Sequence, residues 1–416
     1  MSRLPVADAL AAVLPGTARI EAYDGSKAGP DSAQVVLKIQ SPQAVAHLVS
    51  APGELGLARA YVSGELDIDA PDHYTLLRAL TRTKTGDLSW AERLQVLRSL
   101  GVEAVHWVEP PPEEVGARRY VAGLRRHTKD RDALAISHHY DVSNTFYRWV
   151  LGPSMAYTCA VYTSVDATLE QAQAEKFDLV CRKLALAPGM RLLDVGCGWG
   201  GMAMHAAEHY GVDVIACTLS AQQAEWGTEQ VQAKGLGDRV DIRFSDYRDI
   251  DDTGFHAVSS IGLTEHIGIG QLASYATFLA GKLLPQGRLL NHCITRPDDH
   301  SPPISKRGFI PRYVFPDGEL PGVGRIVREL QAAGLEVRHE ENLREHYART
   351  CRAWCDNLDA HWGEAVQEVG LGTARVWALY LAGSRLGFER NDIQLHQVLA
   401  VKTVDGLSGF PLRPSY

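Results

Sequence analysis

The chemically most informative residues form a run of alternating glycines after an apolar segment that ends in an acid. Residues 190–201 read Met-Arg-Leu-Leu-Asp-Val-Gly-Cys-Gly-Trp-Gly-Gly, which places Gly196, Gly198 and Gly200 after Asp194. Glycine tolerates positive φ and lets the backbone approach a ligand closely. The spacing differs from the G-x-G-x-x-G of dinucleotide sites, where pyrophosphate lies at the helix N-terminus. An acid beside the turn repels phosphate but suits a positively charged amino-acid tail. The pattern therefore predicts a site for S-adenosylmethionine, and a simple tight turn is the alternative.

Further polar residues suited to the rest of that ligand follow along the chain. Thr218 and Gln223 can hold a ribose or a carboxylate. Asp246 can accept a hydrogen bond from an adenine amino group, and Tyr247 can flank the ring. An ordinary loop acid is the alternative interpretation of Asp246.

A second kind of chemistry is indicated by an acid and an imidazole. Glu265 follows one predicted strand in Gly-Leu-Thr-Glu-His, and His292 lies near the end of the next in Asn-His-Cys-Ile. Such residues at adjacent strand ends can converge on one pocket. The alternative is that His292 is a hydrogen-bonded structural residue.

The elements that must position these residues alternate between strand and helix. Strands are predicted at residues 191–195, 212–218, 240–244, 256–261, 287–292 and 336–339. Alternation at this spacing predicts an α/β fold with a mostly parallel, doubly wound, Rossmann-like sheet. Ligands of such sheets bind at the carboxyl ends of the strands.

A polar, proline-initiated stretch near residue 130 predicts two domains, at residues 1–125 and 126–416. The smaller N-terminal domain is predicted to be α+β, with a strand at 33–39 and helices at 74–82 and 91–100, and lipid capture is our hypothesis for it. A helix at 374–389 is predicted to pack in the core. Residues 296–312 hold four prolines and are predicted to be irregular, as a lid or a surface excursion.

Composition excludes several classes of protein. A net charge of -8 argues against nucleic acid as the main partner, because phosphate contacts need a concentrated positive face. No stretch of about 18 apolar residues is present, and the N-terminus lacks a signal-peptide pattern. Seven cysteines without paired spacing fit reduced thiols, and no metal site is predicted. A cytoplasmic enzyme is expected.

Several spaced motifs together resemble the cyclopropane-fatty-acyl-phospholipid synthases, class I methyltransferases that depend on S-adenosylmethionine. The matching motifs are His-Tyr-Asp-Val-Ser-Asn-Thr-Phe at 139–146, Tyr-Thr-Cys-Ala at 157–160, Leu-Asp-Val-Gly-Cys-Gly-Trp-Gly-Gly at 193–201, Thr-Leu-Ser-x-x-Gln at 218–223, Asp-Tyr-Arg-Asp at 246–249, Glu-His at 265–266, Tyr-Val-Phe-Pro-Asp-Gly at 313–318 and Asn-Asp-Ile-Gln-Leu-His at 391–396. The resemblance is strong over residues 130–400, and the extra N-terminal domain resembles the full-length bacterial phospholipid-modifying members.

The resemblance implies a substrate, a mechanism and site residues. The substrate is a cis double bond in an oleoyl-type phospholipid acyl chain, the cofactor donates its methyl group as an electrophile, and bound bicarbonate deprotonates the resulting carbocation. The positions that match the bicarbonate site are Cys159, Glu265, His292, Ile294 and Tyr347, with His139 nearby.

Within this set, the resemblance gives each residue a role. Cys159 would hold the anion through its backbone N–H, so its thiol need not be a nucleophile, and a buried apolar cysteine is the alternative. His292 and Tyr347 would donate hydrogen bonds, and Glu265 would accept one from the bicarbonate hydroxyl. Tyr157 and Thr158 would contact the cofactor.

Two departures from the common family pattern leave the product open. Thr264 replaces the usual Phe before Glu-His, and Asn291 replaces the usual Leu before the site histidine. These variants resemble an actinobacterial branch that makes a 10-methylene acyl chain, the precursor of tuberculostearic acid. A cyclopropane chain is the other product, and a 10-methyl chain would need a separate reductase as partner.

Contact with the inner face of the membrane is expected without a membrane-spanning segment. The candidate basic patch for anionic headgroups consists of Arg118, Arg119, Arg125, Arg126, Lys129 and Arg131. Two other functions stay open: a methyltransferase of another small molecule, and a non-catalytic cofactor-binding subunit of a lipid-modifying complex. The sequence does not decide whether the chain forms a homo-oligomer.

Overall fold

The computed structural model divides into two compact units. It describes residues 4–12, 14, 17–51, 53–81, 108–114, 128–129, 131–132, 142–300, 305 and 308–416. The first unit consists of Met1–Arg119, Ser305–Pro316 and Trp354–Leu386, and the second unit is the remainder. The predicted boundary between residues 125 and 126 lies outside the described residues. Two later segments thus pack with the N-terminal part of the chain.

The first unit is built on a small mixed sheet with the order β2-β1-β3-β4. Its strands are β1 (Arg19–Ala22), β2 (Lys27–Ala28), β3 (Val36–Ile39) and β4 (Leu66–Asp69), and only the β1–β3 pair is parallel. Its helices are α1 (Val6–Ala11), α2 (Pro42–Ser50), α3 (Glu54–Val62), α4 (His73–Thr81), α14 (Phe309–Tyr313) and α17 (Trp362–Val369), with parts of α16 (Arg344–Ala360) and α18 (Leu371–Glu389). The predicted α+β character is confirmed.

Helix α18 and the segment at 296–312 test two of the sequence predictions. The helix predicted at 374–389 is α18, and its Val376 and Leu379 belong to the buried core of the unit, as predicted. The irregular segment predicted at 296–312 is wrong at its end, because α14 occupies Phe309–Tyr313. The helix predicted at 91–100 lies outside the described residues.

A buried ion pair in the first unit offers a test of its stability. Arg59 donates to both oxygens of Glu114, at 2.5 and 2.7 Å, and the Glu114 side chain is only 2% exposed. Replacing Arg59 by methionine leaves Glu114 with only longer contacts, to Arg312 and to Tyr313, both at 3.4 Å. We therefore expect the free energy of unfolding of this unit to fall by about 1.5–3 kcal/mol, the contribution of a hydrogen bond to a charged group. Hydrogen exchange of the α3 amides measures it. Lys38→Met breaks an exposed pair with Asp69 and should cost under about 1 kcal/mol; equal losses would contradict the prediction.

The second unit contains a seven-stranded sheet with the order β10-β11-β9-β8-β5-β6-β7. Its strands are β5 (Arg191–Val195), β6 (Asp213–Thr218), β7 (Val240–Phe244), β8 (Phe255–Ile261), β9 (Leu283–Thr295), β10 (Glu336–Asn342) and β11 (Gln394–Val401). The pairs from β9 to β7 are parallel, and β11 is antiparallel to both of its neighbours. The predicted doubly wound, mostly parallel sheet is confirmed, and β11 is the strand that the sequence analysis missed.

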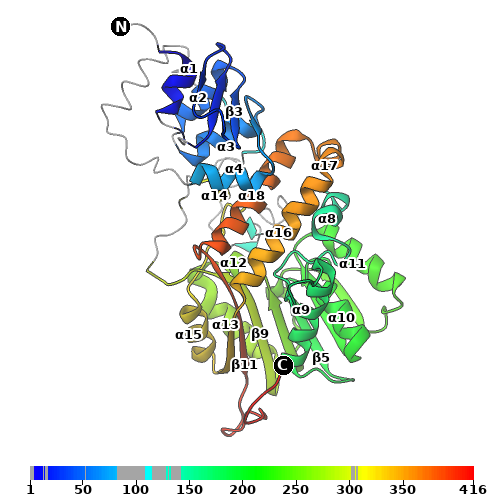
Figure 1. The fold of residues 1–416 in the computed structure, drawn as a ribbon. Coiled ribbons are helices and arrows are strands. Elements are labelled where there is room, and N and C mark those ends of the chain that lie inside the picture. Colours follow the sequence, from blue (N-terminus) through cyan, green and yellow to red (C-terminus); the bar gives the residue numbers. More distant parts are fainter. Residues whose placement is uncertain are drawn as a thin grey trace. The chain divides into compact units, whose positions relative to one another are not determined.

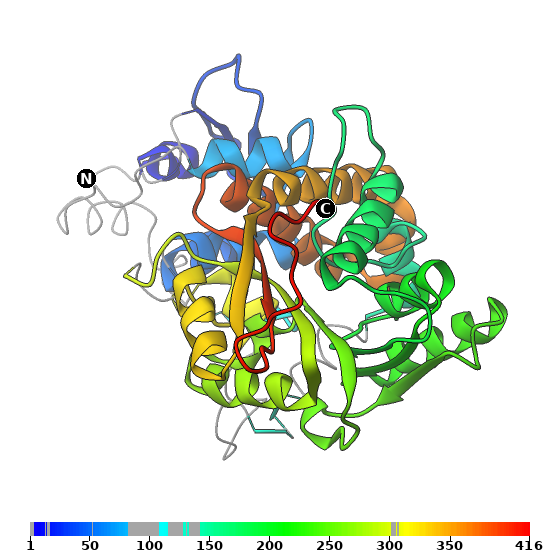
Figure 2. The same cartoon turned by 90° about the horizontal axis from the view of Figure 1, so that it is seen from below.

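Helices cover both faces of this sheet, and successive side chains of its strands point alternately into the two cores between the sheet and these helices. Leu192 of β5 packs with α9 (Leu169–Leu184) and α10 (Gly201–Tyr210), and Val231 of α11 (Ala221–Ala233) joins the same core. The next residue, Leu193, packs with α13 (Leu272–Lys282) and α15 (Val323–Ala332) on the other face. Figures 1 and 2 show α13 and α15 on one side of the sheet and α9 and α10 on the other. The carboxyl ends of the parallel strands therefore share one open edge.

Helix α9 begins with a capping box and carries two lysines on its buried face. Thr168 accepts from the backbone N–H of Gln171, and the Gln171 side chain accepts from the backbone N–H of Thr168. The buried positions recur at helical spacing, and Lys176 and Lys183 occupy two of them. Both lysines are almost fully buried, at 1% and 0% exposed. Burying a charged group is costly unless it has partners, so both positions point to specific interactions.

No helix within the described residues is long and apolar enough to cross a membrane.

Candidate active site

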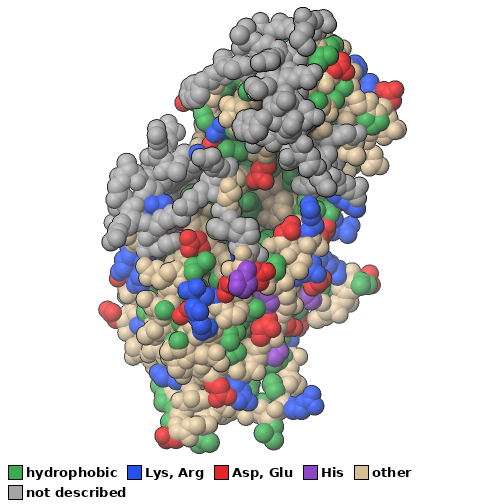
Figure 3. All heavy atoms as spheres, turned by 90° about the vertical axis from the view of Figure 1, so that its left-hand side faces the viewer, with side chains coloured by type: hydrophobic (Ala, Val, Ile, Leu, Met, Phe, Trp, Pro, Cys, Tyr) green, Lys and Arg blue, Asp and Glu red, His purple; other side chains and the backbone are tan. Residues whose placement is uncertain are grey.

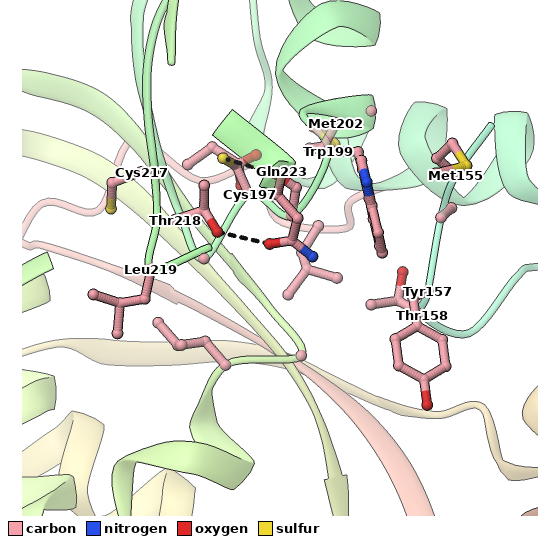
Figure 4. A pocket seen from close by; sticks show the side chains of 18 of the residues that line it. Met155, Tyr157, Thr158, Cys197, Trp199, Met202, Cys217, Thr218, Leu219 and Gln223 are labelled. Atoms are coloured by element: carbon pink, nitrogen blue, oxygen red, sulfur yellow. Dashed lines mark hydrogen bonds between the residues drawn. The ribbon is translucent and has the colours of Figure 1, made fainter. Parts of the chain in front are cut away.

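A pocket in the second unit opens beside the glycine turn at the carboxyl ends of β5, β6 and β8. Its empty space, which includes open solvent, is about 890 Å³. In Figure 4, Met155, Tyr157 and Thr158 lie on one side of it, and Thr218 and Leu219 lie on the other. Eight of the nine predicted cofactor residues line it: Tyr157, Thr158, Asp194, Gly196, Gly198, Thr218, Gln223 and Tyr247.

The glycine turn has the backbone conformation that its sequence predicts. Gly196 and Gly198 have φ of +76° and +55°. A Cβ on Gly196 would lie 3.0 Å from the Leu263 Cβ, so the turn has no room for a side chain there. The backbone of the turn thus lines the pocket directly, as a close approach to a ligand requires.

Substituting Gly196 by alanine should therefore weaken cofactor binding. Alanine at this φ costs about 1–2 kcal/mol of backbone strain, and its Cβ would also press on Leu263 in the pocket wall. We expect the Kd for S-adenosylhomocysteine to rise at least about tenfold, as measured by calorimetry. Gly189→Ala is the matched control, because Gly189 has φ +81° and nothing within 4 Å of its Cβ position. If both variants bind equally well, the turn does not contact the ligand.

Asp194 presents an unsatisfied carboxyl oxygen at the tip of β5. Its Oδ1 accepts from the Ser259 hydroxyl at 2.6 Å, whereas its Oδ2 is buried and has no hydrogen-bond partner in the described part of the chain. Burial raises its pKa to about 6, against the lowering effects of Ser259 and Lys176. A buried acceptor in the pocket wall fits the ammonium of a methionyl tail, so the residues present fit S-adenosylmethionine.

Lys176 is a pocket residue that the sequence analysis missed. Its Nζ donates to the Thr158 hydroxyl at 3.0 Å and lies 3.7 Å from the centre of the Phe177 ring. Burial lowers its pKa to about 7. The sequence signal for Lys176 is its place on α9, where the helical spacing of the buried residues predicts an apolar side chain.

The other predicted cofactor residues differ in what they bind. The Thr218 hydroxyl donates to the Gln223 side-chain oxygen at 2.7 Å, which Figure 4 shows as a dashed line. Asp246 does not line the pocket: its two oxygens accept from the Arg248 side chain at 2.7 and 2.6 Å. Its contact with adenine stays a prediction, and its neighbour Tyr247 lines the pocket instead.

Glu265 and His292 form a second polar centre, in α12 (Thr264–Ile267) and β9. The backbone N–H of Ile294 donates to Glu265 Oε1 at 2.7 Å, while Glu265 Oε2 and His292 Nε2 are buried and have no hydrogen-bond partner among the residues that the structure describes. Burial raises the pKa of Glu265 to about 7. The pKa of His292 lies well below its usual value because of burial and the positive charges of Lys176 and Lys183.

Hydrogen bonds to Leu343 bring Cys159 and the Tyr347 backbone to the same part of the unit. The Leu343 carbonyl accepts from Cys159 Sγ at 3.8 Å and from the Tyr347 backbone N–H at 3.0 Å. The Leu343 N–H donates to Leu395, which pairs with Ile294 in the sheet. Burial raises the Cys159 pKa, so its thiol stays protonated and is not a nucleophile. These bonds place the segments that carry Cys159, Ile294 and Tyr347 next to one another, and the assignment of the five described residues to a bicarbonate site stays a prediction.

The two departures from the family pattern contact one another. The Thr264 hydroxyl donates to the Asn291 side-chain oxygen at 2.6 Å, and both residues are 2% exposed. The Asn291 amide donates onward to Cys293 Sγ at 3.3 Å. This polar pair joins α12 to β9 directly beside Glu265 and His292.

Other predicted residues lie partly outside the described chain. His139, Arg118, Arg119, Arg125 and Arg126 are outside the described residues. Of the predicted basic patch, Lys129 pairs with Asp249, and Arg131 binds both oxygens of Asp317 at 2.5 and 2.7 Å. On the coloured part of the face in Figure 3, basic side chains lie among acidic ones.

Comparison with known proteins identifies the family. The model of the family described as mycolic acid cyclopropane synthetase matches residues 127–398. The chain belongs to this family. It is an S-adenosylmethionine-dependent methyltransferase, and the predicted resemblance is confirmed.

Relatives of this family member match it over nearly its whole length. A probable fatty acid methyltransferase of Mycobacterium tuberculosis is 56% identical over 95% of this chain and 94% of its own. The cyclopropane-fatty-acyl-phospholipid synthase of Escherichia coli is 30% identical over 90% of each chain.

Solved structures match the methyltransferase part. The cyclopropane synthase MmaA2 from Mycobacterium tuberculosis superposes with a TM-score of 0.62 at 31% identity, over 65% of this chain and 98% of the other. The mycolic acid cyclopropane synthase CmaA1, complexed with SAH and CTAB, gives a TM-score of 0.61 at 31% identity, over 65% and 98%.

Proposed function

We propose that this methyltransferase adds the methyl carbon of S-adenosylmethionine to the cis double bond of an oleoyl-type phospholipid acyl chain, and that bound hydrogen carbonate accepts the proton that must leave. The observation that carries the proposal is the pair of buried polar atoms without partners, Glu265 Oε2 and His292 Nε2. Such atoms are rare unless a ligand satisfies them. The match, over 90% of each chain, to a relative named as a cyclopropane-fatty-acyl-phospholipid synthase supports the substrate class.

The protein's own residues would hold the reactants in place. When bound, S-adenosylmethionine supplies an electrophilic methyl group and hydrogen carbonate supplies a base. Asp194 would bind the methionyl ammonium, and Thr158 and Lys176 would face the opposite, anionic end of the same tail. An alkene is a weak nucleophile, so alignment in a dry site supplies much of the rate.

The second polar centre would bind an ion that both accepts and donates hydrogen bonds. A neutral His292 with its proton on Nε2 donates to an oxygen of hydrogen carbonate. Glu265 Oε2 accepts from the hydroxyl of the same ion. The Ile294 N–H is already committed to Glu265, so Ile294 contributes by fixing that carboxyl group. Cys159 and Tyr347 complete the proposed set.

Two products follow from one first step. The π electrons of the alkene would form a bond to the methyl carbon as its bond to sulfur breaks, which releases S-adenosylhomocysteine and leaves positive charge on the neighbouring chain carbon. Loss of a proton from the new methyl group to the base would let the C–H electrons close a cyclopropane ring. If a hydride first shifts from the methylated carbon to the cationic carbon, the charge moves to the methylated carbon, and loss of the same methyl proton gives an exocyclic 10-methylene group. Both routes need one base in one place.

The deciding experiment combines purified full-length protein, oleoyl phospholipid vesicles and methyl-labelled S-adenosylmethionine without a reductant. Mass spectrometry that locates the label distinguishes a ring from a methylene group. We expect labelled lipid, and we expect its formation to fall in buffer freed of carbon dioxide and to recover when hydrogen carbonate is added. Labelled lipid that forms equally well without hydrogen carbonate would refute the role of the base. Cofactor binding without labelled lipid would favour the non-catalytic subunit.

The substrate requires contact with a membrane surface. We assign phospholipid at the inner face of the membrane as the partner and lipid capture to the first unit. Co-sedimentation of the full chain with anionic and with neutral vesicles tests this. A further reductase would be needed only if the final product is a 10-methyl chain.

A further inference from the structure

A line of buried hydrogen bonds connects α9 to His292. Lys183 Nζ donates to Gln397 Oε1 at 2.7 Å, and Gln397 Nε2 lies 3.2 Å from His292 Nδ1. Lys183, Gln397 and His292 are at most 1% exposed. Strand pairing places Gln397 directly opposite His292, because β11 and β9 are neighbours in the sheet. The three side chains belong to α9, β11 and β9 of the second unit, so nothing in the line depends on the other unit.

The chemistry of lysine sets the direction of every bond in this line. An ammonium group donates hydrogen bonds and has no acceptor. The Gln397 atom that faces Lys183 must therefore be its oxygen, and its NH₂ group must face His292. His292 Nδ1 then has to accept, which leaves the ring proton on Nε2. The tautomer follows from the network, which is how such positions are assigned in proteins.

Lys183 keeps its positive charge because of a carboxylate at the rim. Its Nζ also binds Glu341, whose side chain is 38% exposed. Burial lowers the pKa of Lys183, and the hydrogen bond from Lys183 to Glu341 opposes this shift. The ring of Tyr416 lies 5.7 Å from Nζ and adds a further favourable contact. Two cationic neighbours, Lys176 and Lys183, disfavour a charged imidazole, so the choice at His292 is between its two neutral tautomers.

We propose that Lys183 and Gln397 are positioning residues that hold His292 as the Nε2–H tautomer, so that the imidazole presents a hydrogen-bond donor, and not a base, to the reaction site. What this donor binds rests on the proposed function: it is an oxygen of hydrogen carbonate. Neither Lys183 nor Gln397 touches that ion in this account. The buried Nε2 atom without a partner is the place where the line ends.

The tautomer can be read directly from the full-length protein without substrate or hydrogen carbonate. Ring-¹⁵N-labelled histidine gives distinct nitrogen shifts for protonated and unprotonated ring nitrogens, and His292→Gln identifies the signals of this residue. At neutral pH we expect a protonated Nε2 and an unprotonated Nδ1. A wild-type spectrum with the proton on Nδ1, or averaged between both nitrogens, would overturn the inference whatever the variants do.

An isosteric substitution should reverse the tautomer. In Gln397→Glu, a carboxylate accepts both from Lys183 and from the ring, so the proton should move to Nδ1. We expect kcat to fall about 100-fold, the loss typical of removing one aligned donor from a charge-stabilising site, while the KM for S-adenosylmethionine changes little. Gln394→Glu, on the same strand with its amide bonded to Asn391, is the control and should change neither property. An unchanged His292 spectrum in Gln397→Glu would count against the proposal.

Removing the lysine tests the origin of the line. In Lys183→Met, the Gln397 amide is free to turn, and we expect mixed His292 tautomers with a similar loss of kcat. Lys282→Met is the control, since Lys282 is also buried but donates to the Ile250 carbonyl. If the Nε2–H tautomer is found but no labelled lipid forms, the proposed function fails and the assignment of His292 stands. If lipid forms with His292 in the other tautomer, the reverse holds.

Discussion

Glu265→Gln is expected to reduce kcat by about 100- to 1,000-fold while the Kd of the cofactor stays nearly unchanged. Glutamine keeps the bond from the Ile294 N–H, because its side-chain oxygen can still accept. The uncharged NH₂ group of glutamine then takes the place of the free carboxyl oxygen. It is a donor, so it cannot accept from the hydroxyl of the proposed hydrogen carbonate. Loss of one aligned group at a charge-stabilising site has this magnitude. Steady-state rates and calorimetry separate the two effects.

The same variant, although less active, should become more stable than the wild type as the pH rises. Below about pH 4.5, Glu265 is protonated in both the folded and the unfolded chain. Between that pH and its folded pKa of about 7, the unfolded chain releases the proton and the folded chain keeps it, so the wild type loses stability as the pH rises. Glutamine does not titrate. The free energy of unfolding of Glu265→Gln relative to wild type should therefore rise across this window, by up to about 3 kcal/mol.

Urea unfolding of both proteins at about pH 5 and about pH 8 measures this difference. Glu208→Gln is the control, because Glu208 of α10 is exposed and pairs with Lys234. A difference that stays constant with pH would show that Glu265 is ionised in the folded protein throughout. A variant with full activity would exclude Glu265 from the proposed chemistry.

Asp194→Asn is expected to raise the Kd for S-adenosylmethionine by about 10- to 100-fold at neutral pH. A hydrogen bond to a charged group contributes about 1.5–3 kcal/mol, and the asparagine lacks the charge that would pair with the ammonium. In the wild type, the affinity should fall about tenfold per pH unit below the Asp194 pKa of about 6, because the carboxyl must lose its proton to bind. The variant should lack this dependence.

Lys176 also changes charge near pH 7, and its charge and that of Asp194 affect each other's pKa. The pH dependence of wild type and of Asp194→Asn is therefore compared below about pH 6, where Lys176 is charged. Asp213→Asn is the matched control, since Asp213 begins the neighbouring strand β6 and has a side chain that is 57% exposed. Calorimetry across pH tests all three proteins. An equal Kd for wild type and Asp194→Asn would place the ammonium elsewhere.

The sequence predicted the parts of the site that depend on local chain geometry. Alternating glycines after an apolar strand have few conformations, and Gly196 and Gly198 adopt the expected positive φ. The carboxyl ends of parallel strands meet at one edge, so Thr218 and Tyr247 could be placed in the pocket from strand order alone. The family resemblance added Cys159 and, from α16, Tyr347, whose positions no periodic pattern reveals.

Side chains that depend on distant partners could not be predicted in this way. Asp246 has a suitable position, but it bonds Arg248, and nothing in the spacing shows which neighbour a carboxylate will choose. Lys183 meets Gln397 across 214 residues of sequence. Strand β11 was missed because nothing in a short apolar run near the end of the chain indicates that it inserts between two earlier strands.

Helix α9 supplies a lysine to each of the two polar centres, Lys176 to the cofactor pocket and Lys183 to the line that ends at His292. The two lysines are seven positions apart, which corresponds to about two turns and about 10.5 Å along the helix axis. The length of this helix segment therefore sets the spacing between the cofactor pocket and the hydrogen-bonded line to His292. An inserted residue in this segment would rotate one lysine by about 100° away from its target. This stretch of helix therefore has to keep its residue count.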